Sequence, residues 1–297
     1  MTSFHKVLLP CSLLLLIVSL ILVSATTEQS LLPTSTVRRV MPWMCLERCG
    51  SSPAQIQSHL AQLKEHRSSL TAVSFEKYNL GPNSTLVSNN LTNVLPQLQL
   101  LQLETYPMIS SYPYPPQFLD WMRELFANPQ PFFQSTLEEG LRNSYTGYNV
   151  DFEPQGDPAP TKEDATAYAN FLSEFAVELH VHGMKLTVDV ASWSNLWNFT
   201  LLGESGADRV ITMSTYTGSQ PSWESALQQG VEQIGVAHLG VGLQTINTVN
   251  NQNYTDAELQ TRFQAIEQDD VQEIDIWTMP IPDNWWPFID AFAAQGG

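Results

Sequence analysis

The sequence predicts an α/β fold, a single-domain (β/α)8 TIM barrel, from three observations. Short runs rich in β-branched and aromatic residues alternate with longer segments whose apolar residues recur at helical spacing. Eight such units suit a barrel of about 250 residues. No Pro/Ser-rich linker divides residues 38–297. The alternative is a doubly wound open sheet, but its first strand is usually followed by a Gly-rich phosphate loop, which this chain lacks.

The predicted elements follow in chain order. Pro53 opens a helix over 54–63, Thr161 opens a longer amphipathic helix, and residues 255–258 form a capping box before a third. The predicted strands cover residues 39–45, 71–78, 104–110, 146–153, 185–191, 209–216, 236–243 and 273–280.

The N-terminal residues predict a signal peptide. Lys6 supplies a positive start, residues 7–23 are nearly all Leu, Ile and Val, and residues 23–25 offer small side chains for cleavage. Removal of residues 1–25 would leave an N-terminal extension over 26–37 and the barrel domain over 38–297. A retained signal anchor is the alternative, but the apolar run is near the lower limit for a membrane span.

The charge of the chain disfavours polyanionic partners. Lys and Arg number 13 against 30 Asp and Glu, a net charge of −17 that becomes 12 − 30 = −18 once Lys6 is removed. Neither nucleic acid nor, after signal cleavage, a membrane surface is an expected partner. A secreted or lysosome-like location is expected.

Two cysteines remain in the mature chain. Cys45 and Cys49 predict a disulfide that closes a short loop, as is usual in secreted proteins. A two-cysteine metal site is the alternative, but no His cluster lies nearby to complete it. Four Asn-x-Ser/Thr sequons indicate glycosylated surface segments: Asn83, Asn90, Asn198 and Asn253.

The most informative segment is residues 146–153, TGYNVDFE. As a strand it alternates between an apolar face and a polar face. Polar side chains are costly to bury without partners, whereas a strand end that opens into a cleft accommodates them. The alternative is an ordinary strand whose polar face lies in water. The apolar face holds Tyr148, Val150 and Phe152, and the polar face holds Asn149, Asp151 and Glu153.

The other strand ends predict a carbohydrate site. In a barrel, active groups gather at the C-terminal ends of the strands. Rings stack on the apolar faces of sugars, and amides and carboxylates pair with hydroxyls, whereas phosphorylated ligands need Arg or Lys, which these strand ends do not supply. No cofactor and no metal are expected. The candidate side chains are Trp43, Glu76, Asp189, Trp193, Tyr216, Gln244 and Trp277.

Residues 146–153 resemble the fourth-strand motif D-x-x-D-x-D-x-E of glycoside hydrolase family 18, the chitinase-like group. Asp151 and Glu153 match, whereas Thr146 and Asn149 replace two Asp residues, and Asn149 resembles the di-N-acetylchitobiase branch. Residues 213–216, MSTY, are similar to the Met-x-Tyr segment of strand six, and Trp277 matches the strand-eight Trp that floors the sugar site. The S-x-G-G element of strand three is not visible at residues 108–111.

The resemblance implies substrate-assisted, retaining cleavage of β-linked N-acetylglucosamine in chitin-type oligosaccharides or the N-glycan core. Glu153 would donate the proton, Asp151 would orient the acetamido N–H, and Tyr216 would bond its carbonyl. Asn149 could hydrogen-bond Asp151 without adding charge. The other substrate-binding residues would be Trp277, Trp193, Gln244, Trp43 and Glu76.

Two other functions stay open at this point. The chain could be a non-catalytic, chitinase-like carbohydrate-binding protein, since two motif acids are replaced, although it keeps Glu153. It could also be an ordinary retaining glycosidase in which Glu76 or Asp189 is the second carboxylate. That mechanism needs carboxyl groups about 5–5.5 Å apart.

Overall fold

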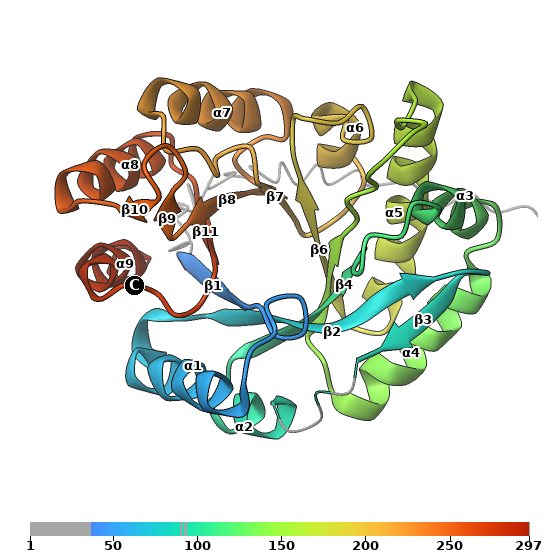
Figure 1. The fold of residues 1–297 in the computed structure, drawn as a ribbon, viewed down its shortest axis with the longest axis horizontal. Helices are drawn as coiled ribbons and strands as arrows, with labels where there is room; N and C mark the ends of the chain where they lie inside the picture. Colours follow the sequence, from blue (N-terminus) through green and yellow to red (C-terminus); the bar gives the residue numbers. More distant parts are fainter. Residues whose placement is uncertain (1–36, 90, 92–93, 297) are drawn as a thin grey trace, which may run out of the picture. The chain divides into compact units, whose positions relative to one another are not determined.

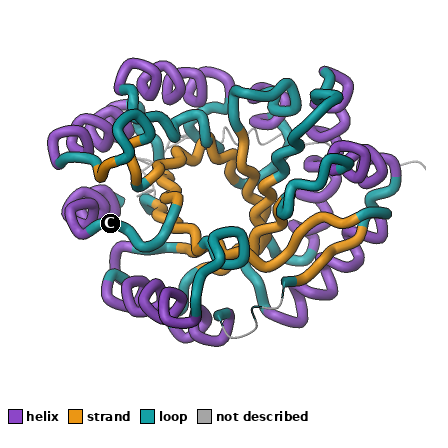
Figure 2. Tube along the Cα trace, viewed as in Figure 1, coloured by secondary structure: helices purple, strands orange, loops and turns teal. Residues whose placement is uncertain are grey.

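The computed structural model describes residues 37–89, 91 and 94–296. The predicted signal peptide, nearly all of the N-terminal extension and the sequon at Asn90 lie outside these residues. In the described part, eight parallel strands form a closed ring inside a ring of helices (Figures 1 and 2). The ring closes because β1 pairs with both β11 and β2, which confirms the predicted (β/α)8 barrel. The strands are β1 (Arg39–Met44), β2 (Ala72–Gly81), β4 (Glu104–Ser110), β5 (Gly147–Asp151), β6 (Lys185–Val190), β7 (Arg209–Thr212), β8 (Leu239–Gln244) and β11 (Glu273–Trp277).

Three helices begin where the sequence predicts caps. Each of the three predicted starts carries a capping box, in which an N-cap hydroxyl and a side chain three residues later bond each other's backbone N–H. The N-caps are Ser52, Thr161 and Thr255. The helices are α1 (Pro53–Glu65), α2 (Leu95–Leu100), α3 (Phe118–Ala127), α4 (Gln130–Asn143), α5 (Lys162–Val181), α6 (Phe199–Gly203), α7 (Gln220–Gln233), α8 (Asp256–Gln268) and α9 (Trp286–Ala294), with 3-10 turns at Arg67–Ser69 and Asp283–Trp285.

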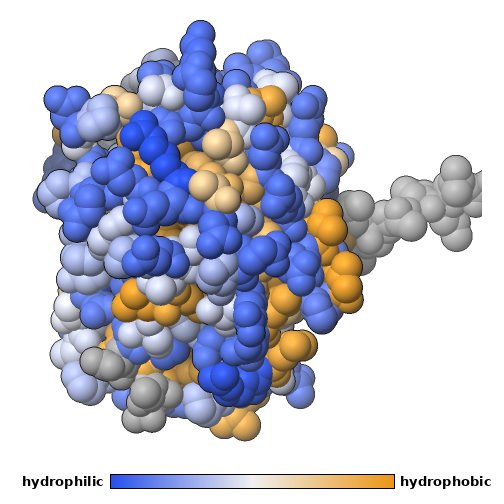
Figure 3. Space-filling model, turned by 90° about the vertical axis from the view of Figure 1, so that its right-hand side faces the viewer, coloured by the Kyte–Doolittle hydropathy of each residue, from blue (hydrophilic) through white to orange (hydrophobic). Residues whose placement is uncertain are grey.

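Two additions to the barrel are absent from the sequence-based prediction. Strand β3 (Thr85–Ser88) pairs antiparallel with the far end of β2, and β9 (Ile246–Asn247) pairs with β10 (Gln252–Asn253) in a short hairpin. On the side of the molecule drawn in Figure 3, hydrophilic side chains predominate and hydrophobic ones form scattered groups. Within the described ranges, no helix is long and apolar enough to cross a membrane.

Strand β5 shows how the alternating pattern is used. The outward residues of β5 and of the segment just after it pack on helices. The Tyr148 hydroxyl donates a 2.6 Å bond to the Thr136 carbonyl of α4, and the ring of Phe152, which follows the strand, lies edge-on to Phe118 of α3. The inward residues of β5, Asn149 and Asp151, are buried in the barrel. The strand ends at Asp151, two residues earlier than predicted, because a proline follows Glu153 and disfavours continued pairing.

A network of ion pairs lies at the opposite end of the barrel, where the strands begin. Five strands begin with a charged residue, and these five side chains form one network. Arg39 bonds Glu104 at 2.7 Å and Glu273 at 2.9 Å. Arg209 bonds Glu273 at 2.7 Å, and Lys185 bonds Glu104 at 3.1 Å. Three cations thus share two carboxylates at the N-terminal ends of the strands.

Candidate functional site

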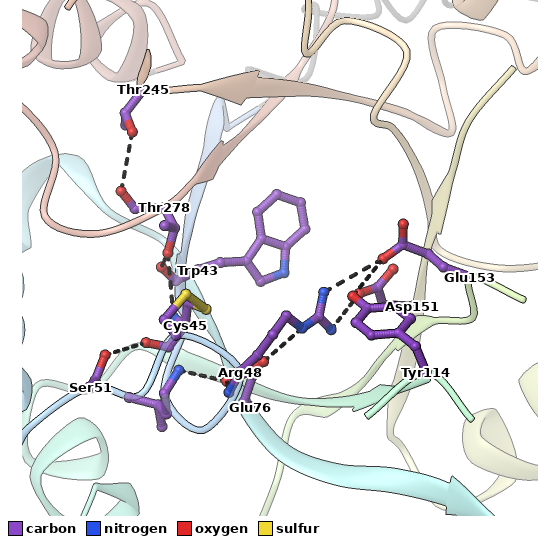
Figure 4. Close-up of a disulfide and its surroundings, with 12 residues drawn as sticks. Trp43, Cys45, Arg48, Ser51, Glu76, Tyr114, Asp151, Glu153, Thr245 and Thr278 are labelled. Carbon is purple, nitrogen blue, oxygen red and sulfur yellow. Dashed lines mark hydrogen bonds and ion pairs between the residues drawn. A yellow bond between two sulfur atoms is a disulfide. The ribbon is translucent and has the colours of Figure 1, made fainter. Parts of the chain in front are cut away.

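A single arginine lies among three carboxylates at the C-terminal ends of the strands (Figure 4). Arg48 Nε lies 3.0 Å from Glu76 Oε1, Nη2 lies 2.9 Å from Asp151 Oδ2, and Nη1 lies 3.5 Å from Glu153 Oε1. Glu76 comes from β2, Asp151 ends β5, and Glu153 follows it by two residues. The Arg48 side chain is only 14% exposed, so this charge cluster is largely shielded from water.

The loop that carries Arg48 is fixed at several points. Cys45 and Cys49 form the predicted disulfide, with Cα atoms 5.6 Å apart. Glu76 Oε2 accepts backbone N–H bonds from Leu46 at 2.6 Å and from Arg48 at 3.1 Å. The Ser51 hydroxyl donates to the Cys45 carbonyl at 2.8 Å. Glu76 therefore anchors both the backbone and the guanidinium of the Arg48 loop.

Glu153 is poised to hold a proton. Burial raises the pKa of its carboxyl group to about 8, the Asp151 charge and a bond to Asp151 add to the rise, and Arg48 opposes it. The Tyr114 hydroxyl donates to Glu153 Oε1 at 3.4 Å, and the Glu153 N–H donates to the Ser111 hydroxyl at 3.2 Å. The raised pKa favours the protonated form of Glu153 at neutral pH.

Tyr114 adopts a left-handed backbone conformation, with a φ of 61°. A non-glycine residue pays about 1–2 kcal/mol for this conformation and keeps it only where its surroundings fix it. The hydroxyl contact with Glu153 is part of that fixation. The guanidinium carbon of Arg48 also lies 5.5 Å from the Tyr114 ring centroid, so strained backbone, aromatic ring and charge cluster meet at one point.

Asn149 does not bond Asp151, contrary to the prediction from the sequence. Its amide nitrogen donates to Thr187 and to Asp189, each at 3.0 Å, and its oxygen accepts from Trp43 at 3.3 Å. Asn149 therefore spans the barrel interior below Asp151. Burial, followed by the charge of Asp151, raises the pKa of Asp189 well above its ordinary value.

The predicted substrate-binding residues occupy different depths. Trp43 is 1% exposed and Glu76 5%, and both bond protein partners. Trp277 is partly buried, and the Arg48 guanidinium carbon lies 5.5 Å from its ring centroid. Gln244 is also partly buried and pairs with Trp277 in the sheet register. Tyr216 lies in the turn after β7, where a Cβ on Gly242 would come within 2.9 Å of its ring.

A groove leads away from Glu153. Its volume is about 490 Å³, and it runs past residues 154–160 to the segment after β6. Trp193 is 60% exposed there and stands edge-on to Trp197, with ring centroids 5.7 Å apart. The remaining polar lining is uncharged: Gln155, Ser192, Ser194 and Asn195. An aromatic face beside amides and hydroxyls suits a neutral, hydroxylated ligand.

Two residues of the site were not predicted from the sequence. Arg48 and Tyr114 lie in loops, whereas the residues at the strand ends predicted a cleft without Arg or Lys. The structure corrects that expectation by placing Arg48 at the centre. The usable signal was its position between two cysteines, because a disulfide fixes the residues it encloses. Asn83, Asn198 and Asn253 are exposed, and their glycosylation stays a prediction.

The fold resembles that of several solved enzymes. No protein-family model and no curated protein matches the sequence. A chitinase from Chromobacterium violaceum superposes with a TM-score of 0.69 at 15% identity, over 87% of this chain and 98% of that one. The Ostrinia furnacalis Group IV chitinase in complex with allosamidin gives 0.68 at 12%, over 88% and 100%. The Bacillus megaterium spore cortex-lytic enzyme SleL gives 0.71 at 12%, over 85% and 73%.

The fold and the site together define a class. The chain is a (β/α)8 barrel with an acidic cluster at the C-terminal end of its strands, and it shares its fold with chitinases and a spore cortex-lytic enzyme. At these identities the likeness establishes the architecture. The chemistry has to be argued from the residues of this chain.

Proposed function

We propose that this protein is a glycoside hydrolase that cleaves β-linked N-acetylglucosamine by substrate-assisted, retaining catalysis. One observation carries the proposal: the Glu153 carboxyl group lies with Asp151 and Arg48 just after β5, at the C-terminal end of the barrel strands, where burial raises its pKa to about 8. A general acid must hold its proton at the working pH, and Glu153 meets that requirement at neutral pH. The solved chitinases of the same fold support the choice of substrate class.

The residues divide the reaction between them. The acetamido oxygen of the sugar attacks the anomeric carbon while Glu153 gives its proton to the departing glycosidic oxygen. Asp151 holds the acetamido N–H and its developing positive charge, and Tyr216 bonds the carbonyl. Water then opens the cyclic intermediate and returns a proton to Glu153. The groove with Trp193 would bind neighbouring sugars of an oligosaccharide.

The two-carboxylate mechanism has less support. Arg48 forms an ion pair with Glu76 on one side and with Glu153 on the other, so a cation stands between these carboxylates (Figure 4). Asp189 is 2% exposed and accepts a bond from Asn149, and its raised pKa makes it a poor nucleophile.

The predicted signal peptide, together with the disulfide and the exposed sequons, supports a secreted or lysosome-like location. The proposed partner is accordingly an N-acetylglucosamine-containing oligosaccharide of that compartment. The di-N-acetylchitobiase-like Asn149 favours short chitin-type or N-glycan core substrates within this class.

Fluorogenic chitobiose and chitotriose glycosides test the proposal directly. Turnover is expected, together with inhibition by a thiazoline mimic of the cyclised intermediate, which should bind about 10²-fold or more tighter than substrate. An enzyme with a carboxylate nucleophile would instead ignore the thiazoline and be trapped by a 2-fluoro sugar. A carbohydrate-binding protein would bind chitooligosaccharides without turnover and without preferring the thiazoline. Either of these patterns would overturn the proposed mechanism.

A further inference from the structure

Arg48 is the one described residue that touches every carboxylate of the cluster. Its guanidinium donates a hydrogen bond to Asp151, forms ion pairs with Glu76 and Glu153, and lies 5.5 Å from the ring centroids of Tyr114 and Trp277. Arginine presents its N–H groups in a rigid planar fork, so several simultaneous contacts define its orientation. No step of the proposed reaction yet uses this side chain.

Arg48 is built to stay in place. The disulfide and the two N–H bonds to Glu76 hold its backbone, and Glu76 also holds its Nε. A neutral sugar that displaced the guanidinium would leave buried carboxylates without a partner, which is strongly unfavourable. The geometry therefore places a permanent cation beside the acids, with the substrate bound next to it.

Asp151 needs a partner that its own strand does not supply. Asn149, two residues earlier, faces the same side of β5 but gives its amide to Thr187 and Asp189. The bond from Arg48 Nη2 to Asp151 Oδ2, at 2.9 Å, is the shorter of the contacts that Arg48 makes with Asp151 and Glu153. The orientation of the Asp151 carboxylate is thus set from the β1–α1 loop.

We propose that Arg48 is a positioning residue of this site: delivered by the Cys45–Cys49 loop, it fixes the Asp151 carboxylate beside Glu153 and limits the proton affinity of Glu153. The effect of Asp151 positioning on turnover rests on the proposed function. The effect of Arg48 on the proton affinity of Glu153 does not depend on that function. The titratable or charged groups that face Glu153 are Asp151, Arg48, Tyr114 and, deeper in the barrel, Asp189 and Tyr216.

The two parts predict different measurements. Without the guanidinium, Glu153 keeps its burial and its acidic neighbour but loses the charge that opposes them, so its pKa rises above about 8. The basic limb of the pH profile should then move to higher pH. Once Asp151 is no longer held by Arg48, its carboxylate is misplaced, and kcat should fall by about 10- to 100-fold. KM should change by less than about threefold, because a neutral substrate binds mainly through the groove.

The experiment compares Arg48→Met and Arg48→Lys with Arg142→Met, a surface control whose partner is Glu139 on α4 and whose side chain is 64% exposed. Carboxyl ¹³C NMR titration follows Glu153, whose signal is assigned by its loss in Glu153→Gln. Kinetics with fluorogenic chitobiose follow turnover, with and without millimolar methylguanidinium. Arg48→Lys keeps the charge without the fork, and Arg48→Gln replaces Arg48→Met as the neutral variant if Arg48→Met does not fold.

The expected result is a raised Glu153 titration midpoint in Arg48→Met, a midpoint near wild type in Arg48→Lys, and reduced kcat in both. Methylguanidinium should restore part of the kcat of Arg48→Met and none in the control. In Arg48→Met, either an unchanged Glu153 titration midpoint or full turnover would overturn the inference. If the wild type hydrolyses neither glycoside, the proposed function fails, and the NMR titration alone then decides whether Arg48 governs Glu153.

Discussion

The two ends of the barrel treat their glutamates in opposite ways. At the N-terminal end, burial alone would raise the pKa of Glu104, but the bonds and charge of Arg39, with Tyr106 and Lys185, outweigh it and lower the pKa to about 2. At the C-terminal end, burial and Asp151 raise the pKa of Glu153 to about 8 against the pull of a single guanidinium. The same residue type is held ionised at one end and protonated at the other.

The difference lies in the supply of cations. At the N-terminal ends of the strands, three cations pair with Glu104 and Glu273. At the C-terminal ends, one cation pairs with Glu76, Asp151 and Glu153. Carboxylates with enough cations stay ionised and stabilise a fold, whereas a deficit of cations raises a carboxyl pKa, a shift that acid catalysis can use. The comparison therefore assigns stability to one end and chemistry to the other.

Glu153→Gln should have the largest effect. The amide keeps the shape of the side chain but has no proton to transfer, so kcat is expected to fall by about 10²–10⁴-fold while the melting temperature does not fall. Glu104→Gln is the matched change at the other end and should lower stability while leaving kcat unchanged. Steady-state kinetics and calorimetry on both variants check this, and near-wild-type turnover in Glu153→Gln would remove it as the proton donor.

Glu273→Gln should produce the largest loss of stability. The Glu273 side chain is 0% exposed and bonds both Arg39 and Arg209, so an amide leaves two cations without their shared partner. The expected loss is about 3 kcal/mol, which corresponds to a fall of about 6–12 °C in melting temperature for a chain of this size. Denaturant unfolding measures it. A variant as stable as wild type would show that the N-terminal network does not stabilise the barrel.

The sequence predicted the barrel well because its signals are local. Each of the eight parallel strands starts within three residues of its predicted start, and the three predicted helix caps are present. Strand alternation and capping depend on neighbouring residues only. The ends of β5, β7 and β11 were predicted two to four residues too late, because the pattern of side chains continues after the backbone has left the sheet.

The site was predicted only in part, because only some of its residues belong to strands with a local sequence pattern. Asp151 and Glu153 were found because they belong to a strand. Arg48 and Tyr114 were missed because loop geometry decides where they point. The predicted partner of Asn149 was wrong because its amide nitrogen bonds Asp189 on the neighbouring strand β6, while its oxygen accepts a bond from Trp43 on β1. Such contacts between strands are set by the closed sheet and have no local sequence pattern.

The pH dependence of stability should separate the two ends. Glu153 has a folded pKa above its ordinary value of 4.5, so it stabilises the fold below that value and loses the contribution as pH rises toward about 8. Glu104 has a folded pKa below 4.5, so its contribution is present above that value and is lost as pH falls toward about 2. Maximal stability is expected near pH 5, with a slope of up to about 1.4 kcal/mol per pH unit for each group.

Melting temperatures between pH 2 and 9 check this expectation. Glu153→Gln should flatten the fall above pH 5, and Glu104→Gln should flatten the fall below it. Burial, followed by the charge of Glu273, also raises the pKa of Asp275, so some of the alkaline fall should persist in Glu153→Gln. A stability that rises from pH 5 to pH 8 would contradict the pKa assigned to Glu153.

The smallest effect is expected from the disulfide, and it tests whether the two ends are held by different means. The N-terminal network is non-covalent, whereas Arg48 lies in a loop closed over only a few residues. Because a short loop gains little entropy on opening, Cys45→Ser combined with Cys49→Ser should cost about 1–3 kcal/mol. The Glu76 bonds to the loop backbone remain, so kcat should fall less than in Arg48→Met. Two results would contradict this account. Two free thiols in the mature wild-type chain, found by mass spectrometry, would show that no disulfide holds the Arg48 loop. A double variant with kcat as low as that of Arg48→Met would show that the Glu76 bonds do not help to hold it.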